Sequence, residues 1–346
     1  MSPRDSRAAP SLCAALATLL IAPTCGTAQA LFASADRLDL TLAVDLRALL
    51  KDRGDDRQEH PGKLTLVDGS GNQRVLDVDV RTRGNFRLRR STCAFPPLRL
   101  DFPKQGTEDT PFAGQDKLKL VTHCQRRAAS EQDVLHEYLL YRILNLLTDK
   151  SFRARLARVT YRDTGGGEDS VTRYAVLLES DGELTARHAA NLFEQQGVSQ
   201  DLTDREQMGI VSVYQYLIGN TDWSVAGLHN IVLLRDSAGT PYAVPYDFDW
   251  SGVIFAPYAA PAPQIGTKSV RERVYRGYCP EDADLAALVA LFNAHKDAIY
   301  ALYRNQDGLE PREVSQTLAY FDDFYRTLND PRSARREFRR NCQSAR

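Results

Sequence analysis

The stretch Ile218-Gly-Asn-Thr-Asp-Trp-Ser-Val-Ala-Gly-Leu-His-Asn230 marks the place where a predicted helix ends and a polar loop begins. Thr203 and Glu206 have the spacing of a capping box, and Gly219 is a typical helix terminator. Between them, apolar side chains recur at helical spacing, at Met208, Val211, Tyr214 and Leu217. The sequence therefore predicts a helix followed by a loop that carries an acid and an amide, Asp222 and Asn230.

The chain after this loop is predicted to be mainly helical. Two short strands, Ile231–Leu234 and Tyr242–Val244, lead to a second acidic segment, Pro245-Tyr-Asp-Phe-Asp-Trp250. A proline-rich loop follows, from Ala256 to Pro263. Periodicity then predicts helices over Asp282–Tyr303, Pro311–Leu328 and Ser333–Arg340.

The chain before the loop is predicted to be mainly strands. Alternating apolar residues predict strands over Lys63–Val67, Val75–Arg81, Leu98–Phe102, Lys117–Val121, Ala154–Tyr161 and Arg173–Leu178. The first two flank a glycine-rich turn at 68–72 and are expected to form a hairpin. One helix interrupts the strands, over Glu131–Leu147, with Ser130 as its N-cap.

The N-terminal segment has the features of a secretory signal. Arg4 and Arg7 precede an apolar run from Leu12 to Ala22, and Ala28-Gln-Ala30 matches a cleavage site. The run is too short to span a bilayer, and no later segment is apolar enough to predict a transmembrane helix. We therefore expect residues 1–30 to be a signal peptide and the protein to be exported, either periplasmic or extracellular.

The cysteines agree with export. Cys13 and Cys25 fall in the predicted signal, which leaves four in the rest of the chain. An even number in an exported chain favours two disulfides, although four cysteines allow three pairings and buried free thiols are the alternative. The pairing that we expect is Cys93–Cys124 and Cys279–Cys342.

The charge balance argues against a nucleic-acid partner. The net charge is -1, with 26% charged and 43% hydrophobic residues, as in an ordinary globular protein. Several arginines between Arg81 and Arg90 surround a glycine turn, but no basic balance elsewhere supports binding to nucleic acid.

The order of the elements is that of protein-kinase-like enzymes. It predicts an α+β, two-lobed protein-kinase-like fold, with an antiparallel β-rich N-lobe carrying one helix, residues 31–179, and a mainly helical C-lobe, residues 180–346. From Leu64 to Trp250, the chain also resembles one family, the exported kinase-like proteins related to spore-coat protein H (CotH). The resemblance rests on Arg83-Gly-Asn85, Lys117-Leu-Lys-Leu120, Tyr174-Ala-Val-Leu-Leu-Glu179, Asn220-Thr-Asp222 with Asn230, and Asp247-Phe-Asp249.

The resemblance implies phosphoryl transfer from ATP, with Mg²⁺ or Mn²⁺, to a hydroxyl of a protein or small molecule. Asp222 would orient and deprotonate that hydroxyl. Asn230, Asp247 and Asp249 would hold the metal, although Asn230 follows Asp222 at a longer spacing than in the kinase signature. The alternatives are structural: a turn-capping Asp222, a strand-initiating Asn230 and a salt-bridged acidic pair.

Nucleotide contacts are expected from the β-rich half. Lys119, or else Lys117, would reach the phosphates with Glu137 as its partner, while solvated lysines are the alternative. A glycine turn would cover the phosphates, and backbone groups at a strand end would hold the adenine. The residues expected to contact the nucleotide are Lys119, Lys117, Glu137, Arg83, Gly84, Asn85 and Glu179.

The sequence leaves other functions open. A catalytically inactive kinase-like module would bind an envelope partner or a glycan, and little ATP is available outside the cytoplasm. A metallohydrolase would use His123 and His229 with Asp222 and Asp247, but no recognised ligand spacing supports it. A Ser-His-Asp hydrolase is disfavoured because the chain contains no Gly-x-Ser-x-Gly elbow.

Overall fold

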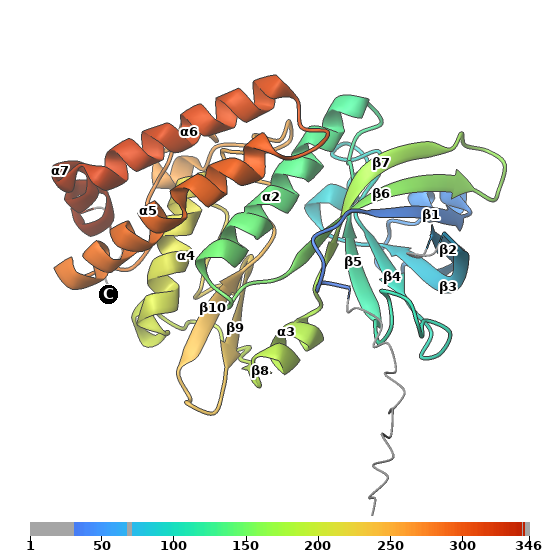
Figure 1. Cartoon of the computed structure of the whole chain (residues 1–346), viewed down its shortest axis with the longest axis horizontal. Coiled ribbons are helices and arrows are strands. Elements are labelled where there is room, and N and C mark those ends of the chain that lie inside the picture. The colour runs from blue at the N-terminus through green and yellow to red at the C-terminus, as the bar shows by residue number, and fades with distance from the viewer. Residues whose placement is uncertain (1–30, 68–70, 341, 343–346) are drawn as a thin grey trace, which may run out of the picture.

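The computed structural model describes residues 31–67, 71–340 and 342. Two parts lie side by side in Figure 1: a β-barrel built from the first half of the chain, and a helical part built mostly from the second. The predicted signal peptide, residues 1–30, and residues 68–70 of the predicted hairpin turn lie outside the described residues.

The first part is a closed barrel of seven strands in the order β1-β2-β3-β4-β5-β7-β6. The strands are β1 Leu38–Val44, β2 His60–Val67, β3 Gln73–Thr82, β4 Leu98–Asp101, β5 Lys117–Val121, β6 Ala154–Asp163 and β7 Val171–Leu178. Alternate side chains point inward along each strand, and Leu42, Leu64, Val78 and Leu100 are among those that fill the interior.

The predicted fold class is wrong. The protein-kinase-like fold required an antiparallel β-rich lobe with one helix, whereas the observed sheet is mixed and closed. It closes because β1 pairs antiparallel with β2 and parallel with β6, where Leu38 lies opposite Ala157. Strand β1 is absent from the strands that the sequence predicts, and a helix, α1 (Leu46–Lys51), follows it. Closure through β1 satisfies backbone groups that would otherwise form two exposed sheet edges.

The second part contains most of the helices. They are α3 Asp181–Arg187, α4 Arg205–Ile218, α5 Asp282–Arg304, α6 Pro311–Asn329 and α7 Pro331–Arg335, followed by a π-helical turn, Arg336–Arg340. A three-stranded sheet, in the order β10-β9-β8, contains β8 Asn191–Leu192, β9 Ile231–Arg235 and β10 Pro241–Pro245. Short 3₁₀ turns are η1 Phe86–Leu88, η2 Ala128–Ser130, η3 Gln200–Leu202 and η4 Pro263–Ile265.

Helix α2 (Glu131–Leu147) lies between the two parts (Figure 1). It contacts β6 and β7 of the barrel as well as α4 and α5. Leu135, Leu139 and Ile143 are buried in a hydrophobic cluster that continues into α4, α5 and α6. Because α2 packs on both parts, its polar residues Glu137 and Tyr141 have fixed positions between them.

Caps set the two ends of α4. Asp204 is the N-cap in place of the predicted Thr203, since its carboxylate accepts a hydrogen bond from the backbone N–H of Gln207 at 2.8 Å. Gly219 ends the helix with a φ of +67°, which confirms the predicted stop. A Cβ at Gly219 would also clash with the hydroxyl of Tyr320. The polar loop therefore leaves the helix at a defined point.

Both expected disulfides are present. The Cα atoms are 4.6 Å apart in Cys93–Cys124 and 5.0 Å apart in Cys279–Cys342, which confirms the pairing. Such cross-links persist in oxidising compartments, so they support an exported protein.

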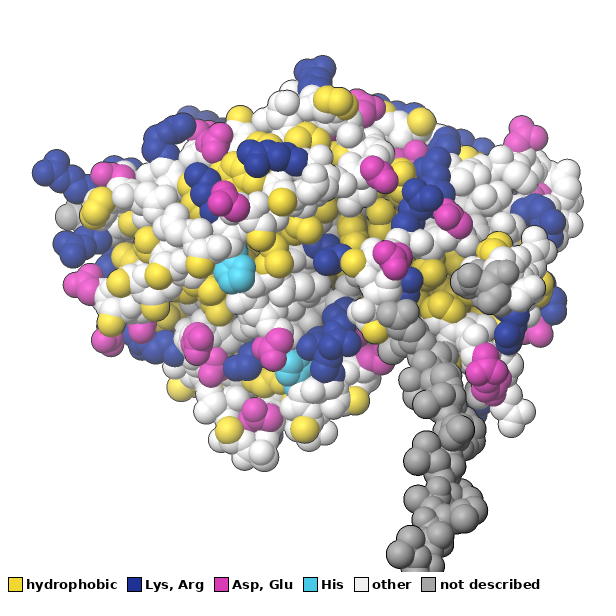
Figure 2. All heavy atoms as spheres, viewed as in Figure 1, with side chains coloured by type: hydrophobic (Ala, Val, Ile, Leu, Met, Phe, Trp, Pro, Cys, Tyr) yellow, Lys and Arg dark blue, Asp and Glu magenta, His cyan; other side chains and the backbone are white. Residues whose placement is uncertain are grey.

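By length and composition, α5 is the one helix in the described part of the chain that is apolar enough to cross a membrane. It packs against α2, α4 and α6. On the face shown in Figure 2, basic and acidic side chains are interspersed across both parts, in agreement with the net charge of -1.

Candidate functional site

Nearly all of the predicted site residues line one cavity of about 390 Å³. Its walls come from the loop before η1, from β5, from the middle of α2, from the 222–230 loop and from the segment after β10. The predicted residues that line it are Arg83, Gly84, Asn85, Lys119, Glu137, Glu179, Asp222, Asn230, Asp247 and Asp249. Lys117 is the exception, because it lies exposed at the first position of β5.

Lys119 lies on the barrel side of the cavity. Its Nζ is 3.1 Å from the Oδ1 of Asp181, at the start of α3. The rings of Phe152 and Tyr246 lie 5.6 Å and 5.5 Å from the same ammonium group. The lysine is therefore held at the cavity wall, but it does not pair with Glu137 as the sequence analysis expected.

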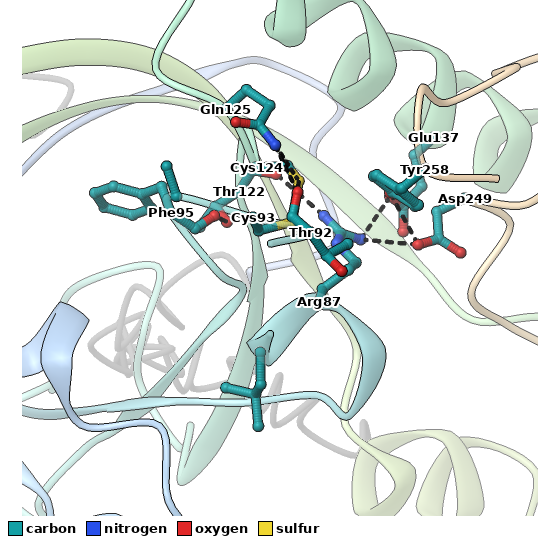
Figure 3. Close-up of a disulfide and its surroundings, with 12 residues drawn as sticks. Arg87, Thr92, Cys93, Phe95, Thr122, Cys124, Gln125, Glu137, Asp249 and Tyr258 are labelled. Atoms are coloured by element: carbon teal, nitrogen blue, oxygen red, sulfur yellow. Dashed lines mark hydrogen bonds and ion pairs between the residues drawn. A yellow bond between two sulfur atoms is a disulfide. The ribbon is translucent and has the colours of Figure 1, made fainter. Parts of the chain in front are cut away.

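The partner of Glu137 is Arg87, and Figure 3 shows the arrangement. The Nη1 of Arg87 lies 3.6 Å from the Oε2 of Glu137 and 3.6 Å from the Oδ2 of Asp249. Its Nη2 donates a hydrogen bond to the carbonyl oxygen of Thr122 at 3.1 Å. The planar guanidinium of Arg87 has several N–H donors, so it can contact two carboxylates and a carbonyl oxygen at once. The ammonium group of Lys119, on β5, pairs with Asp181 instead.

The carboxyl groups of the cavity are crowded. Burial raises the pKa of Glu137 to about 7, and the nearby charge of Asp247 adds to this effect while Arg87 opposes it. Burial and Asp247 also raise the pKa of Asp249 well above its usual range, again against Arg87. The hydroxyl of Tyr258 donates a hydrogen bond to the Oδ2 of Asp249 at 3.0 Å. Three acids thus lie close together while the buried guanidinium of Arg87 pairs with two of them, Glu137 and Asp249, and this arrangement favours the entry of a further cation.

The β9–β10 hairpin brings Asn230 and Asp247 together. Ile231, the first residue of β9, pairs with Pro245, the last residue of β10. Asn230, just before β9, and Asp247, just after β10, therefore lie at the same end of the hairpin. The φ angles are +51° at Asn230 and +59° at Asp247, a left-handed conformation that is rare outside glycine and clusters at functional sites. The backbone N–H of Asp247 donates a hydrogen bond to the hydroxyl of Tyr141 on α2 at 3.0 Å.

The 220–230 loop returns Asn230 to Asp222 despite their long spacing. Ser224 and His229 exchange backbone hydrogen bonds of 2.9 and 3.0 Å, which folds the intervening residues into a small hairpin. The Nδ2 of Asn230 then donates hydrogen bonds to the backbone O of Asp222 at 2.8 Å and to its Oδ2 at 3.0 Å. This use of the amide nitrogen leaves the Oδ1 of Asn230 as the atom for a cation.

His229, which the sequence suggested only as a residue of a metallohydrolase, is a hydrogen-bond partner of Asp222. Its Nε2 donates a hydrogen bond to the Oδ1 of Asp222 at 2.8 Å. Both carboxylate oxygens of Asp222 therefore have a partner within the loop. The signal in the sequence was the position of His229 close to Asp222 and directly before Asn230.

The remaining predicted residues shape the wall of the cavity. The carboxylate of Glu179 accepts hydrogen bonds from Arg187 at 2.9 and 3.0 Å and from the backbone N–H of Arg153 at 3.0 Å. Gly84 has a φ of +99° and open space around its Cα, so that the chain can turn closely over a ligand. The N–H of Arg83 donates to the carbonyl of Pro97 at 2.8 Å and fixes the start of this turn.

The donor set fits a hard divalent cation. Within the described ranges, no group of three or more His, Cys, Asp or Glu side chains is arranged to hold a metal ion. Asp247, Asp249 and the amide oxygen of Asn230 are nevertheless hard oxygen donors, of the kind that Mg²⁺ takes when phosphates and water complete its shell.

No protein-family model matches the chain, and no curated protein matches it.

Proposed function

We propose that the cavity binds a nucleoside triphosphate with Mg²⁺ or Mn²⁺ and transfers the terminal phosphoryl group to a hydroxyl of a protein or small molecule. The observation that carries this proposal is that Lys119, Asp222, Asn230 and Asp247 line one cavity. They come from β5, from the polar loop and from the end of the β9–β10 hairpin, which are far apart in the chain. Cationic groups, an acid and hard oxygen donors are the parts that phosphoryl transfer requires.

Each group has a role that follows from its place. Lys119 and Arg83 would neutralise the phosphates, and Asp247, Asp249 and Asn230 would hold the cation, which screens the charge that develops on the phosphates. Asp222 would orient the acceptor hydroxyl and take its proton. The hydroxyl oxygen forms a bond to the terminal phosphorus, the bond from that phosphorus to the bridging oxygen breaks, and the nucleoside diphosphate leaves.

The second candidate is a binding module without turnover, for an envelope partner or a glycan. The observation in its favour is that both carboxylate oxygens of Asp222 accept hydrogen bonds, from His229 and Asn230. These donors already occupy part of the carboxylate to which an acceptor hydroxyl would bind. Little nucleotide is available outside the cytoplasm, which is a second reason to test the binding module as an alternative.

Transfer of labelled phosphate from ATP, with Mg²⁺ or Mn²⁺, separates the two candidates. We expect Asp222→Ala and Asp247→Ala each to lower the rate by at least about 100-fold, because one removes the base and the other a metal ligand. Lys117→Ala is the matched control and should leave the rate unchanged, since Lys117 lies outside the cavity. Nucleotide binding without turnover would favour the second candidate. Absence of nucleotide binding with every divalent metal would contradict the first.

A further inference from the structure

Arg87 connects three segments around the cavity. It extends from η1 and contacts Glu137 of α2, Asp249 after β10 and the carbonyl of Thr122 after β5. The neighbouring Phe86 packs edge-on against Trp250, with ring centroids 5.3 Å apart. The position of η1 therefore decides both where the guanidinium lies and how one aromatic wall of the cavity packs.

Local structure alone does not fix η1. It is a turn of three residues, and its N-cap Asn85 makes no side-chain cap bond. The segment that follows it, residues 89–95, is instead tied to other parts of the chain. The position of such a short turn is set by the contacts of the neighbouring segment rather than by the hydrogen bonds of the turn itself.

The Cys93–Cys124 disulfide is the covalent attachment, and it leads to the residue that Arg87 contacts. It joins the segment after η1 to the segment after β5, where Thr122 accepts the hydrogen bond of Arg87 (Figure 3). Both cysteines are buried, with 0% and 4% exposed. The backbone N–H of Phe95 also donates to the carbonyl of Cys124 at 2.8 Å, beside the cross-link.

A second clamp holds the outer side of the same segment. The guanidinium of Arg53 donates hydrogen bonds to the carbonyls of Leu88, Cys93 and Ala94 at 3.2, 2.6 and 2.6 Å. Because these bonds do not depend on the cross-link, we expect the segment to stay folded without the disulfide. Hydrogen bonds from Thr122 Oγ1 to the carbonyl of Phe95 and from Gln125 Nε2 to the carbonyl of Thr92 also join this segment to residues 121–125. The disulfide adds a covalent limit on the separation of the two segments.

We propose that the Cys93–Cys124 disulfide is a positioning element of the cavity, which holds Arg87 against Glu137 and Asp249. Without it, η1 shifts relative to β5, the guanidinium leaves the two carboxylates, and these acids lose the orientation in which they face a cation. The inference rests on the proposed function for the ligand, but the position of Arg87 is independent of it.

The second disulfide supplies a matched control. Cys279–Cys342 lies in the helical part, and neither cysteine lines the cavity. The test compares Cys93→Ser/Cys124→Ser with Cys279→Ser/Cys342→Ser for affinity toward Mn²⁺ with ATP and for acrylamide quenching of tryptophan fluorescence. Trp223 is only 2% exposed, so quenching reports mainly on Trp250 at the cavity.

We expect Cys93→Ser/Cys124→Ser to weaken Mn²⁺·ATP binding by about ten-fold or more, as loss of a supporting residue does at metal sites. Its quenching constant should rise about two-fold as the contact between Phe86 and Trp250 loosens. The control pair should change neither quantity, although both variants should melt at a lower temperature. Equal changes in the two pairs, or a lower melting temperature alone, would overturn the proposal.

Arg87→Lys in the chain with both disulfides separates positioning from general stability. A lysine cannot reach both carboxylates and the carbonyl of Thr122, so this variant should weaken binding to a similar degree, and removal of the disulfide should then add little. If Cys93→Ser/Cys124→Ser does not fold, Arg87→Lys carries the test, and wild-type quenching and binding in it would overturn the proposal. If the wild type itself binds no nucleotide, the proposed function fails while the quenching comparison still decides the positioning.

Discussion

At the scale of residues, some side chains of the cavity can be recognised from the sequence and others cannot. Asp222, Asn230 and Asp247 stand out because acids and amides beside apolar helix and strand ends suggest a ligand site. Arg87 does not stand out, since it is one of several arginines between Arg81 and Arg90. Only the packing of η1 against α2 buries this one and pairs it with two carboxylates.

His123 gives a prediction about acid stability. It is 2% exposed beside the rings of Phe95 and Tyr161, and burial lowers its pKa to about 3, an effect to which Arg173 and Arg126 add. As the pH falls below about 6.5, His123 therefore takes up a proton in the unfolded chain but stays neutral in the folded protein. The stabilising contribution of neutral His123 is present above pH 6.5 and is lost as the pH falls from there toward 3.

We expect His123→Phe to remove this part of the acid sensitivity. Between pH 7.5 and pH 5, the free energy of unfolding of the wild type should fall by about 2 kcal/mol more than that of the variant. Urea unfolding at both pH values measures the difference. Equal losses in the two proteins would show that His123 is protonated in the folded state.

At the scale of elements, periodicity predicted several boundaries correctly. Helix α2 and strand β5 have the predicted ends, because helical spacing and alternation are read directly from the apolar residues. The start of α4 is shifted by one residue, from Thr203 to Asp204, because both can cap a helix and only the backbone geometry chooses between them. Strand β1 was missed, although Leu38, Leu40 and Leu42 alternate as strand residues do.

The N-cap of α4 gives a prediction at this scale. Asp204→Ala removes the acceptor for the N–H of Gln207 and should lower the free energy of unfolding by about 1 kcal/mol. Asp204→Asn is the control and should keep most of the stability, because the amide oxygen also caps a helix. Thermal or urea unfolding measures both. A loss in Asp204→Asn as large as in Asp204→Ala would mean that the charge of Asp204, rather than its cap bond, stabilises the helix.

At the scale of the whole molecule, the sequence predicted a strand-rich half followed by a helical half but not how the sheet closes. Closure depends on the parallel pairing of β1 with β6, whose residues lie far apart in the chain. No local pattern encodes such a pairing, and the same strand order fits an open or a closed sheet. The predicted site residues still line one cavity, because the strand β5 and the helix α2 that carry Lys119 and Glu137 were predicted with their correct ends.

The proposed function requires that the cavity between the barrel and the helical part binds a nucleotide. Calorimetry of ATP binding with Mn²⁺, for the wild type, Lys119→Ala and Lys117→Ala, measures this binding. Both lysines come from β5, but only Lys119 lines the cavity. We expect Lys119→Ala to weaken binding by about ten-fold or more and Lys117→Ala to bind as the wild type does. Equal affinities in all three proteins, or no binding by the wild type, would contradict it.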